Sequence, residues 1–354
     1  TTRLVGSEMC IRDRLYTAYK AGADFDKVCF HGNNKTDEEL EYAVKLNVGR
    51  IIVDNIYELK RLDKIAEKQG VTANIMFRIK PGIDAHTHDF VRTGQIDSKF
   101  GFALETGEAM DAVKIALSHP NIHLKGLHCH IGSQIFDIDP FVEAAKVMLK
   151  FIADIKEQTG HEVSELNLGG GFGIKYTEDN DPVPYEAYME KVSVAVKESC
   201  SELNIKLPFI LIEPGRSMAG PAGITLYTCG GIKHIPNIRT YVSVDGGMTD
   251  NPRYALYKSE YEALVANKAD KPRDTKVTIA GKCCESGDLI GEGMPLQEAE
   301  PGDIIAVCAT GAYNYSMSSN YNRVPKPAVV FIKDGESRVA VKRETLEDII
   351  RNDI

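Results

Sequence analysis

The sequence predicts an α/β protein, an incomplete (β/α)8 barrel of the TIM type followed by an antiparallel β-barrel or β-sandwich domain. Short apolar strands alternate with amphipathic helices up to residue 220, as in a parallel sheet covered by helices. Polar residues or glycines follow nearly every strand, which favours a barrel, where all carboxyl ends of strands meet on one face. After residue 220, strand-like runs follow one another, several of them separated by turns, without a comparable helix.

Six strands are expected in the first region, at 28–30, 51–53, 74–79, 124–130, 165–168 and 209–213. Apolar residues at helical spacing fill the intervals, most clearly at 141–155 and 185–196, and also at 40–46, 56–67 and 109–117. A closed barrel needs eight strands. Because no room for two more exists between residues 15 and 213, we expect the first two strands to be missing.

The first fourteen residues, TTRLVGSEMCIRDR, have neither a helical nor a strand period. The run GSEMCIRDR resembles translated cloning or adaptor sequence, and we expect residues 1–14 to be non-native; a disordered natural tail is the alternative. No apolar segment follows the charges, so this is not a secretory signal. The predicted domains are therefore a partial barrel over 15–220 and a β domain over 221–354, closed by a helix at 344–350.

The composition of the 354 residues narrows the class of partner. The net charge is −9 and no run of five Lys or Arg occurs, which excludes a typical nucleic-acid surface. The apolar runs are too short to cross a membrane. The eight cysteines are scattered without a C-x-x-C pair, which indicates a reducing, cytoplasmic setting. We expect a small-molecule partner, with no nucleic acid and no membrane.

Three motifs in the barrel region suggest chemistry. In HCHIGS (128–133), both histidines can share one strand face, where they could chelate a metal, stack on a planar ligand or fill the core. In LNLGGGFG (166–173), the glycines suit a phosphate monoester better than a dinucleotide, although a plain turn is equally compatible. In EPGRS (213–217), Glu213 ends an apolar strand and needs a positive partner, either Arg216 or a pyridinium nitrogen.

Three segments of the β domain, 245–257, 283–288 and 311–322, place polar side chains beside glycines. Such loops can present a site, and ordinary surface loops are the alternative. Within them, Cys284 is either a reactive thiol or a buried one.

Taken in order, these motifs, together with HGNNK (31–35) and DSKFG (97–101), resemble the pyridoxal-phosphate-dependent decarboxylases built from a barrel and a β domain. Within them, the sequence is most similar to the diaminopimelate decarboxylases, because CESGD (284–288) differs from the ornithine enzymes. The resemblance implies decarboxylation of meso-2,6-diaminopimelate to L-lysine, the last step of lysine biosynthesis. Decarboxylation of ornithine, arginine or carboxynorspermidine, or a non-catalytic homologue that binds a partner, are the alternatives.

The resemblance also implies residue roles. His130 would stack on the pyridoxal 5'-phosphate ring and Glu213 would pair with its pyridine nitrogen. The cofactor phosphate would be held by Ser133, Gly170, Gly171, Gly215, Arg216 and Tyr313. The distal carboxylate of the substrate would meet Arg216, Arg253 and Tyr257, with Tyr313 nearby, and Glu285 would take its distal ammonium. Cys284 would donate a proton at Cα, and because the matching residues of the family reach into a neighbour's site, a homodimer with shared sites is implied.

One departure from the family concerns its cofactor-binding lysine, which ends the first barrel strand in a Tyr-Ala-x-Lys-Ala motif. Lys20 stands in the similar run Tyr19-Lys20-Ala21, but within a helical stretch at 15–23. A lysine there would face away from the site, so we do not assign it this role. We therefore expect the chain by itself to be inactive, and poorly stable because an open barrel exposes sheet edges.

Overall fold

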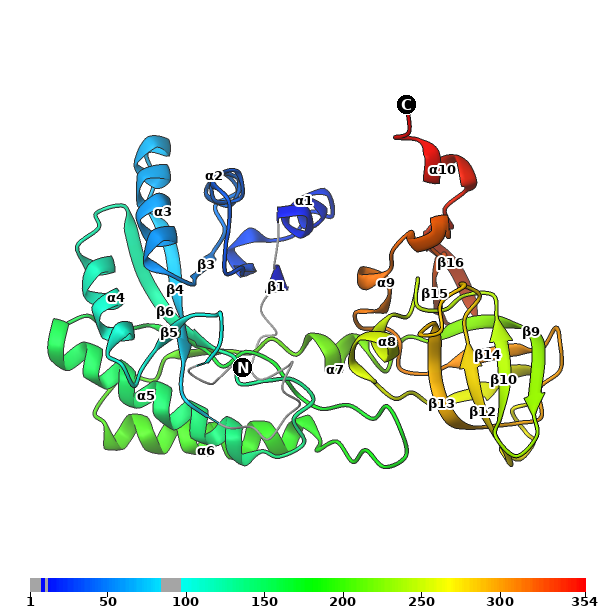
Figure 1. The fold of residues 1–354 in the computed structure, drawn as a ribbon. Helices are drawn as coiled ribbons and strands as arrows, with labels where there is room; N and C mark the ends of the chain where they lie inside the picture. The colour runs from blue at the N-terminus through cyan, green and yellow to red at the C-terminus, as the bar shows by residue number, and fades with distance from the viewer. Residues whose placement is uncertain (1–7, 10–11, 84–96) are drawn as a thin grey trace. The chain divides into compact units, whose positions relative to one another are not determined.

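The computed structural model describes residues 8–9, 12–83 and 97–354. Its contacts divide the chain into two compact units, each of which is considered by itself (Figure 1). The barrel unit comprises Thr1–Gly173 and Pro182–Gly215, and the β unit comprises Ile174–Asp181 and Arg216–Ile354. The short segment Ile174–Asp181 thus packs with the β unit, although its sequence neighbours on both sides belong to the barrel unit.

The barrel unit is built on a parallel sheet with strands in the order β1-β2-β3-β4-β6-β7-β8, and β5 pairs with β4 beside this path. The strands are β1 (Glu8–Met9), β2 (Cys29–Phe30), β3 (Arg50–Val53), β4 (Ala73–Lys80), β5 (Phe102–Ala103), β6 (Ile122–Cys129), β7 (Glu165–Asn167) and β8 (Phe209–Leu211). The parallel sheet with its helices confirms the predicted α/β class. The six expected strands correspond to β2, β3, β4, β6, β7 and β8. The sheet also contains β1 and β5, which have two residues each, too few to leave a period in the sequence.

Helices follow the strands along the chain, as predicted. They are α1 (Arg12–Lys20), α2 (Asp37–Lys45), α3 (Ile56–Gln69), α4 (Glu108–Leu117), α5 (Asp139–Thr159), α6 (Tyr185–Glu202) and the short α7 (Gly215–Ala219), with a 3-10 turn η1 at Phe25–Lys27. The long helices α5 and α6 lie side by side in the barrel unit (Figure 1). No helix in the described ranges is long and apolar enough to cross a membrane.

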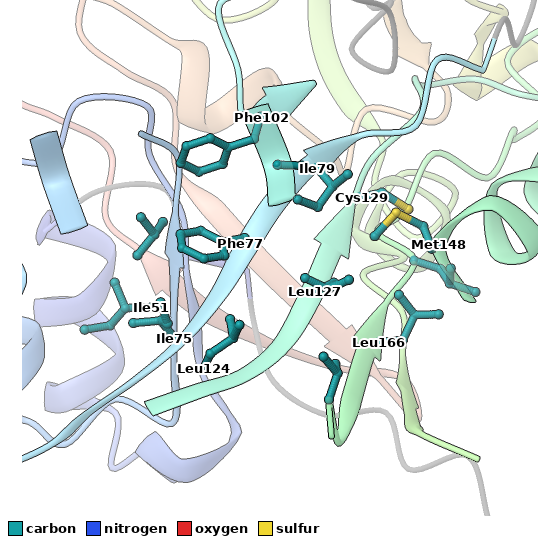
Figure 2. Close-up of a cluster of buried hydrophobic side chains, with 14 of the residues drawn as sticks. Ile51, Ile75, Phe77, Ile79, Phe102, Leu124, Leu127, Cys129, Met148 and Leu166 are labelled. Atoms are coloured by element: carbon teal, nitrogen blue, oxygen red, sulfur yellow. The ribbon is translucent and has the colours of Figure 1, made fainter. Parts of the chain in front are cut away.

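Side chains on the two faces of the parallel sheet belong to different clusters because they alternate along each strand. One face packs against the helices: Ile75, Phe77 and Leu127 belong to the same buried cluster as Met148 of α5 (Figure 2). The opposite face carries a smaller buried cluster made of Cys29, Ile52, Met76 and Leu211. The second cluster lies where a barrel interior is expected.

Helix α2 begins with a capping box, which yields a testable prediction. The Thr36 hydroxyl accepts a hydrogen bond from the Glu39 N–H at 3.3 Å, and the Glu39 carboxylate accepts one from the Thr36 N–H at 2.7 Å. We expect Thr36→Ala to lower the free energy of unfolding by about 1 kcal/mol in urea denaturation, since it leaves a helix-end donor without its cap. Thr72→Ala, at an exposed position outside any helix, is the control. Equal losses in both variants would argue against the capping role.

The β unit contains a six-stranded sheet with the order β11-β14-β9-β10-β12-β13, and a separate hairpin of β15 and β16. Its strands are β9 (Thr225–Ile235), β10 (Arg239–Val244), β11 (Ala263–Val265), β12 (Thr275–Ala280), β13 (Leu289–Leu296), β14 (Ile304–Val307), β15 (Val329–Lys333) and β16 (Glu336–Val341). Helices α8 (Arg253–Tyr257) and α9 (Asn314–Met317) and the turns η3 (Ala266–Lys268) and η4 (Tyr321–Arg323) lie between these strands, and α10 (Leu346–Ile350) follows β16. The sheet is antiparallel as predicted, except that β10 and β12 pair in parallel.

Candidate active site

A layer of polar side chains covers the apolar interior of the parallel sheet. Three of its members stand two residues beyond a member of the interior cluster: His31 after Cys29, Asp54 after Ile52 and Glu213 after Leu211. A spacing of two keeps each polar side chain on the interior face of its strand. His31 and Asp54 are buried there. This layer lies at the carboxyl ends of the strands, where barrel proteins form their sites.

Glu213 is the centre of this layer. Its Oε1 accepts hydrogen bonds from His31 Nε2 at 2.7 Å and from Asn167 Nδ2 at 3.0 Å. Its Oε2 lies 3.4 Å from Nε2 of His128, whose ring meets that of His31 edge to face. The carboxylate is 7% exposed. Three side chains from strands far apart in the sequence therefore orient a single buried carboxylate.

The two protonation states that matter here follow from these contacts. Burial by itself would raise the pKa of Glu213, but the imidazoles of His31 and His128 beside it, together with the hydrogen bond from His31, hold that pKa well below its usual range. Burial lowers the pKa of His128 to about 3, so this imidazole is neutral at pH 7. Glu213 is thus an ionised acceptor, which suits a protonated ring nitrogen.

The glycine loop after β7 is tied to the same carboxylate. Asn167 is fully buried; its amide donates to Glu213, and its Oδ1 accepts the N–H of Gly169 at 2.8 Å. The N–H of Gly170 donates to Nδ1 of His130 at 3.4 Å. A Cβ at residue 170 would lie 2.1 Å from the carbonyl oxygen of Glu213, so only glycine fits. The loop therefore brings His130 and Glu213, two predicted cofactor residues, to one place.

The cluster of His31, His128 and Glu213 also has the composition of a metal site. Two ligands of one tetrahedral zinc ion lie about 3.4 Å apart. The 2.7 Å between His31 Nε2 and Glu213 Oε1 is instead a hydrogen-bond distance. The geometry therefore favours a hydrogen-bonded carboxylate over metal ligation.

In the β unit, Arg253 is the centre of a second cluster. The residue is 7% exposed. Its guanidinium lies over the rings of Tyr176 and Tyr261 at 5.1 and 5.6 Å and donates to the Tyr261 hydroxyl at 2.7 Å. Within the described part of the chain, no carboxylate forms an ion pair with it. A buried cation is costly without an anion, so this position suits an anionic ligand.

Arg216 and Tyr313 belong to this second cluster. Arg216 donates to the Tyr176 hydroxyl at 2.7 Å, and its guanidinium lies 4.7 Å from the centre of the Tyr313 ring. The backbone of Tyr313 has φ +71°, which is strained for a residue with a Cβ. Strain of this kind concentrates at functional sites.

The CESGD loop carries Cys284 and Glu285 on the surface of the β unit, where both are exposed. It is anchored by Asp288, which is buried and accepts the N–H groups of Cys283 at 2.8 Å and Met248 at 2.6 Å. Cys284 is therefore not a buried core thiol, the alternative that the sequence left open. Tyr257, at the end of α8, is 41% exposed.

The remaining candidates are placed as follows. Ser133 follows β6 and is partly exposed. Gly171 has φ +109°, and a Cβ at this position would lie 2.4 Å from the carbonyl oxygen of Gly132. Gly215 begins α7, and its N–H donates to the Glu213 carbonyl at 2.8 Å. Lys20 ends α1 with an exposed side chain whose ammonium lies 5.4 Å from the centre of the Tyr16 ring.

Five residues around Glu213 and Arg253 were not among the predicted site residues: His31, His128, Asn167, Tyr176 and Tyr261. The spacing of two from an apolar strand residue could have identified His31, and the position of Asn167 directly before the glycines could have identified that residue. The two tyrosines give no comparable signal because they join the cluster through long-range packing.

Residues 5–220 match the family model described as "Pyridoxal-dependent decarboxylase, pyridoxal binding domain", so the barrel unit is of the pyridoxal-dependent decarboxylase class. Over 330 residues the chain is 52% identical to the diaminopimelate decarboxylase of Bacillus methanolicus, covering 93% of this chain and 76% of that protein. It is 50% identical to the Bacillus subtilis (strain 168) diaminopimelate decarboxylase over 340 residues, 96% and 77% of the two chains. The chain belongs to the diaminopimelate decarboxylase family.

Solved structures agree with this assignment. The diaminopimelate decarboxylase from M. jannaschii in complex with L-lysine superposes with a TM-score of 0.91 at 34% identity, covering 98% of this chain and 79% of that one. The Helicobacter pylori diaminopimelate decarboxylase complexed with L-lysine superposes with a TM-score of 0.88 at 33% identity, covering 98% of this chain and 83% of that one.

Proposed function

We propose that this protein decarboxylates meso-2,6-diaminopimelate to L-lysine with pyridoxal 5'-phosphate as its cofactor. The observation that carries the proposal is the buried carboxylate of Glu213, held ionised by His31, His128 and Asn167 at the end of a barrel strand. An ionised acceptor at this place fits a protonated pyridine nitrogen, and a neutral amide would not. When bound, the cofactor supplies the electron sink for the pair left behind by departing CO₂.

The residues for the cofactor are those that lie around Glu213 or belong to the arginine cluster. His130, next to the glycine loop, would stack on the ring. The phosphate would be bound by Ser133, Gly170, Gly171, Gly215, Arg216 and Tyr313. The glycines allow a close approach of backbone N–H groups to an anion, which a Cβ at residue 170 would prevent.

The residues for the substrate lie in the β unit. Arg253 is buried without a carboxylate partner in the described part of the chain, which supports its role with Arg216 in binding the distal carboxylate. A hydrogen bond between charged groups contributes about 1.5–3 kcal/mol. Tyr257 and Tyr313 would complete this subsite, and Glu285 would bind the distal ammonium.

The exposed CESGD loop supports a homodimer with shared sites. Cys284 and Glu285 lie on the surface of the β unit, so they are available to a neighbouring copy. Cys284 would then donate the proton that replaces CO₂ at Cα. The seven cysteines in the described ranges are all free, which supports a reducing, cytoplasmic setting.

The experiment measures the affinity of Glu213→Gln and of the unaltered protein for pyridoxal phosphate by equilibrium dialysis. The variant keeps the shape and the acceptor oxygen but loses the charge. We expect it to bind the cofactor about tenfold to a hundredfold more weakly, because a charged hydrogen bond is lost. Glu162→Gln, which alters an exposed glutamate paired with Lys206, is the control and should bind normally. Equal affinity of Glu213→Gln and the control would overturn the assignment of Glu213.

A further inference from the structure

Tyr176 reaches the arginine cluster from an unexpected part of the chain. It lies between the glycine loop and α6, yet its segment packs with the β unit, where its ring is in the buried core. Its backbone is fixed at both ends: its N–H donates to Asn180 Oδ1 at 3.0 Å, and its carbonyl accepts the N–H of Glu262 at 3.1 Å. The side chain is 7% exposed. Tyr176 is therefore a rigid, buried support rather than a surface residue.

Tyr176 contacts both arginines that we assign to the distal carboxylate, and it uses a different part of its side chain for each. Its hydroxyl oxygen accepts a hydrogen bond from Arg216 Nη1 at 2.7 Å. The guanidinium of Arg253 lies 5.1 Å from the centre of its ring. The ring also meets that of Tyr261 edge to face, at 5.4 Å and 89°, and the Tyr261 hydroxyl accepts from Arg253.

Two guanidinium groups on one support repel each other, and burial strengthens this repulsion. The negative face of an aromatic ring and a phenolic oxygen offset part of that cost without neutralising either cation. A carboxylate partner would also offset the cost of burying the two cations, but it would occupy their N–H donors. Tyrosine therefore leaves the remaining N–H donors of Arg253 available to an incoming anion.

We propose that Tyr176 is a positioning residue that holds Arg216 and Arg253 together as one binding site for the distal carboxylate of the substrate. This inference rests on the proposed function. It makes Tyr176 a determinant of specificity, favouring an amino acid that ends in a second carboxylate over one that ends in an ammonium alone.

The test compares the affinities of the pyridoxal-phosphate-treated full chain for meso-diaminopimelate and L-lysine by isothermal titration calorimetry. Tyr176→Phe removes only the hydroxyl, and Tyr176→Leu removes the ring as well. We expect diaminopimelate to bind about tenfold more weakly to the first and about thirtyfold or more to the second. L-Lysine, which lacks the distal carboxylate, should lose less than about twofold in either variant.

The matched control is Tyr241→Phe. Tyr241, on β10, also contacts an arginine in the β unit, with the Arg239 guanidinium 5.6 Å from its ring centre, but this arginine is already paired with Glu292. It should leave both affinities unchanged. If Tyr176 had only a structural role, its substitution would weaken the binding of both ligands equally. That result would overturn this inference but not the proposed function. If the unaltered protein did not prefer diaminopimelate to lysine, the distal-carboxylate site of the proposed function would itself be wrong.

Discussion

Glu165→Ala is expected to lower the free energy of unfolding by about 3–5 kcal/mol, because it leaves a buried cation without its partner. Glu165 accepts two hydrogen bonds from Arg50, at 2.5 and 2.8 Å, and lies 3.1 Å from the Lys125 ammonium. Both Arg50 and Glu165 are more than nine-tenths buried. Arg50 begins β3 and Glu165 begins β7, and β4 and β6 stand between these strands in the sheet. The pair therefore links strands that share no backbone hydrogen bonds.

The variant and its controls are measured by chemical denaturation at pH 7. Arg50→Met combined with Glu165→Leu removes both charges, and it should recover most of the loss because apolar residues of similar size replace the pair. Glu162→Gln, which breaks an exposed pair with Lys206, should change stability by less than about 1 kcal/mol. A loss in Glu165→Ala as small as that of Glu162→Gln would show that the buried pair does not stabilise the sheet.

The alternation of strands and helices was predictable from the sequence because it depends on local periodicity. The run at 74–79 predicted β4, and the apolar spacing at 141–155 predicted α5, whose buried residues include Phe141, Met148 and Ile155. The two-residue strands β1 and β5 were not predictable, since their pairing is set by neighbours in the sheet. The parallel pairing of β10 with β12 was missed for the same reason.

The candidate site was predictable to the extent that its residues lie in distinctive motifs. Glu213 was identified because an acidic residue at the end of an apolar strand needs a partner, and the structure supplies three. The sequence also suggested Arg216 as a partner of Glu213. In the structure, the Arg216 guanidinium donates a hydrogen bond to the hydroxyl of Tyr176. That His31 and Asn167 both donate hydrogen bonds to Glu213 depends on how separate strands are arranged in the sheet. No single sequence motif contains that information.

The free energy of unfolding is expected to fall as the pH is lowered from about 6.5 to about 5, and His128 is the cause. Burial lowers the pKa of His128 from 6.5 to about 3. Below pH 6.5, the unfolded chain binds a proton at this imidazole and the folded protein does not. Stability therefore decreases with falling pH, by up to about 1.4 kcal/mol per pH unit from this one group. Glu213 adds a loss in the same direction only at lower pH, because its ordinary pKa is 4.5.

His128→Gln isolates this contribution, because glutamine places a polar amide beside Glu213 and does not titrate. The free energy of unfolding is measured in urea at pH 7.0, 6.0 and 5.0, values that bracket the ordinary histidine pKa of about 6.5. In this variant it should fall less steeply with falling pH than in the unaltered protein. His123→Gln is the control, since His123 lies on the same strand β6 but is exposed. If His128→Gln kept the slope of the control, the folded protein would bind a proton at His128 near neutral pH. The carboxylate of Glu213 would then be paired with a charged imidazole, and a protonated pyridine nitrogen would have to compete for it.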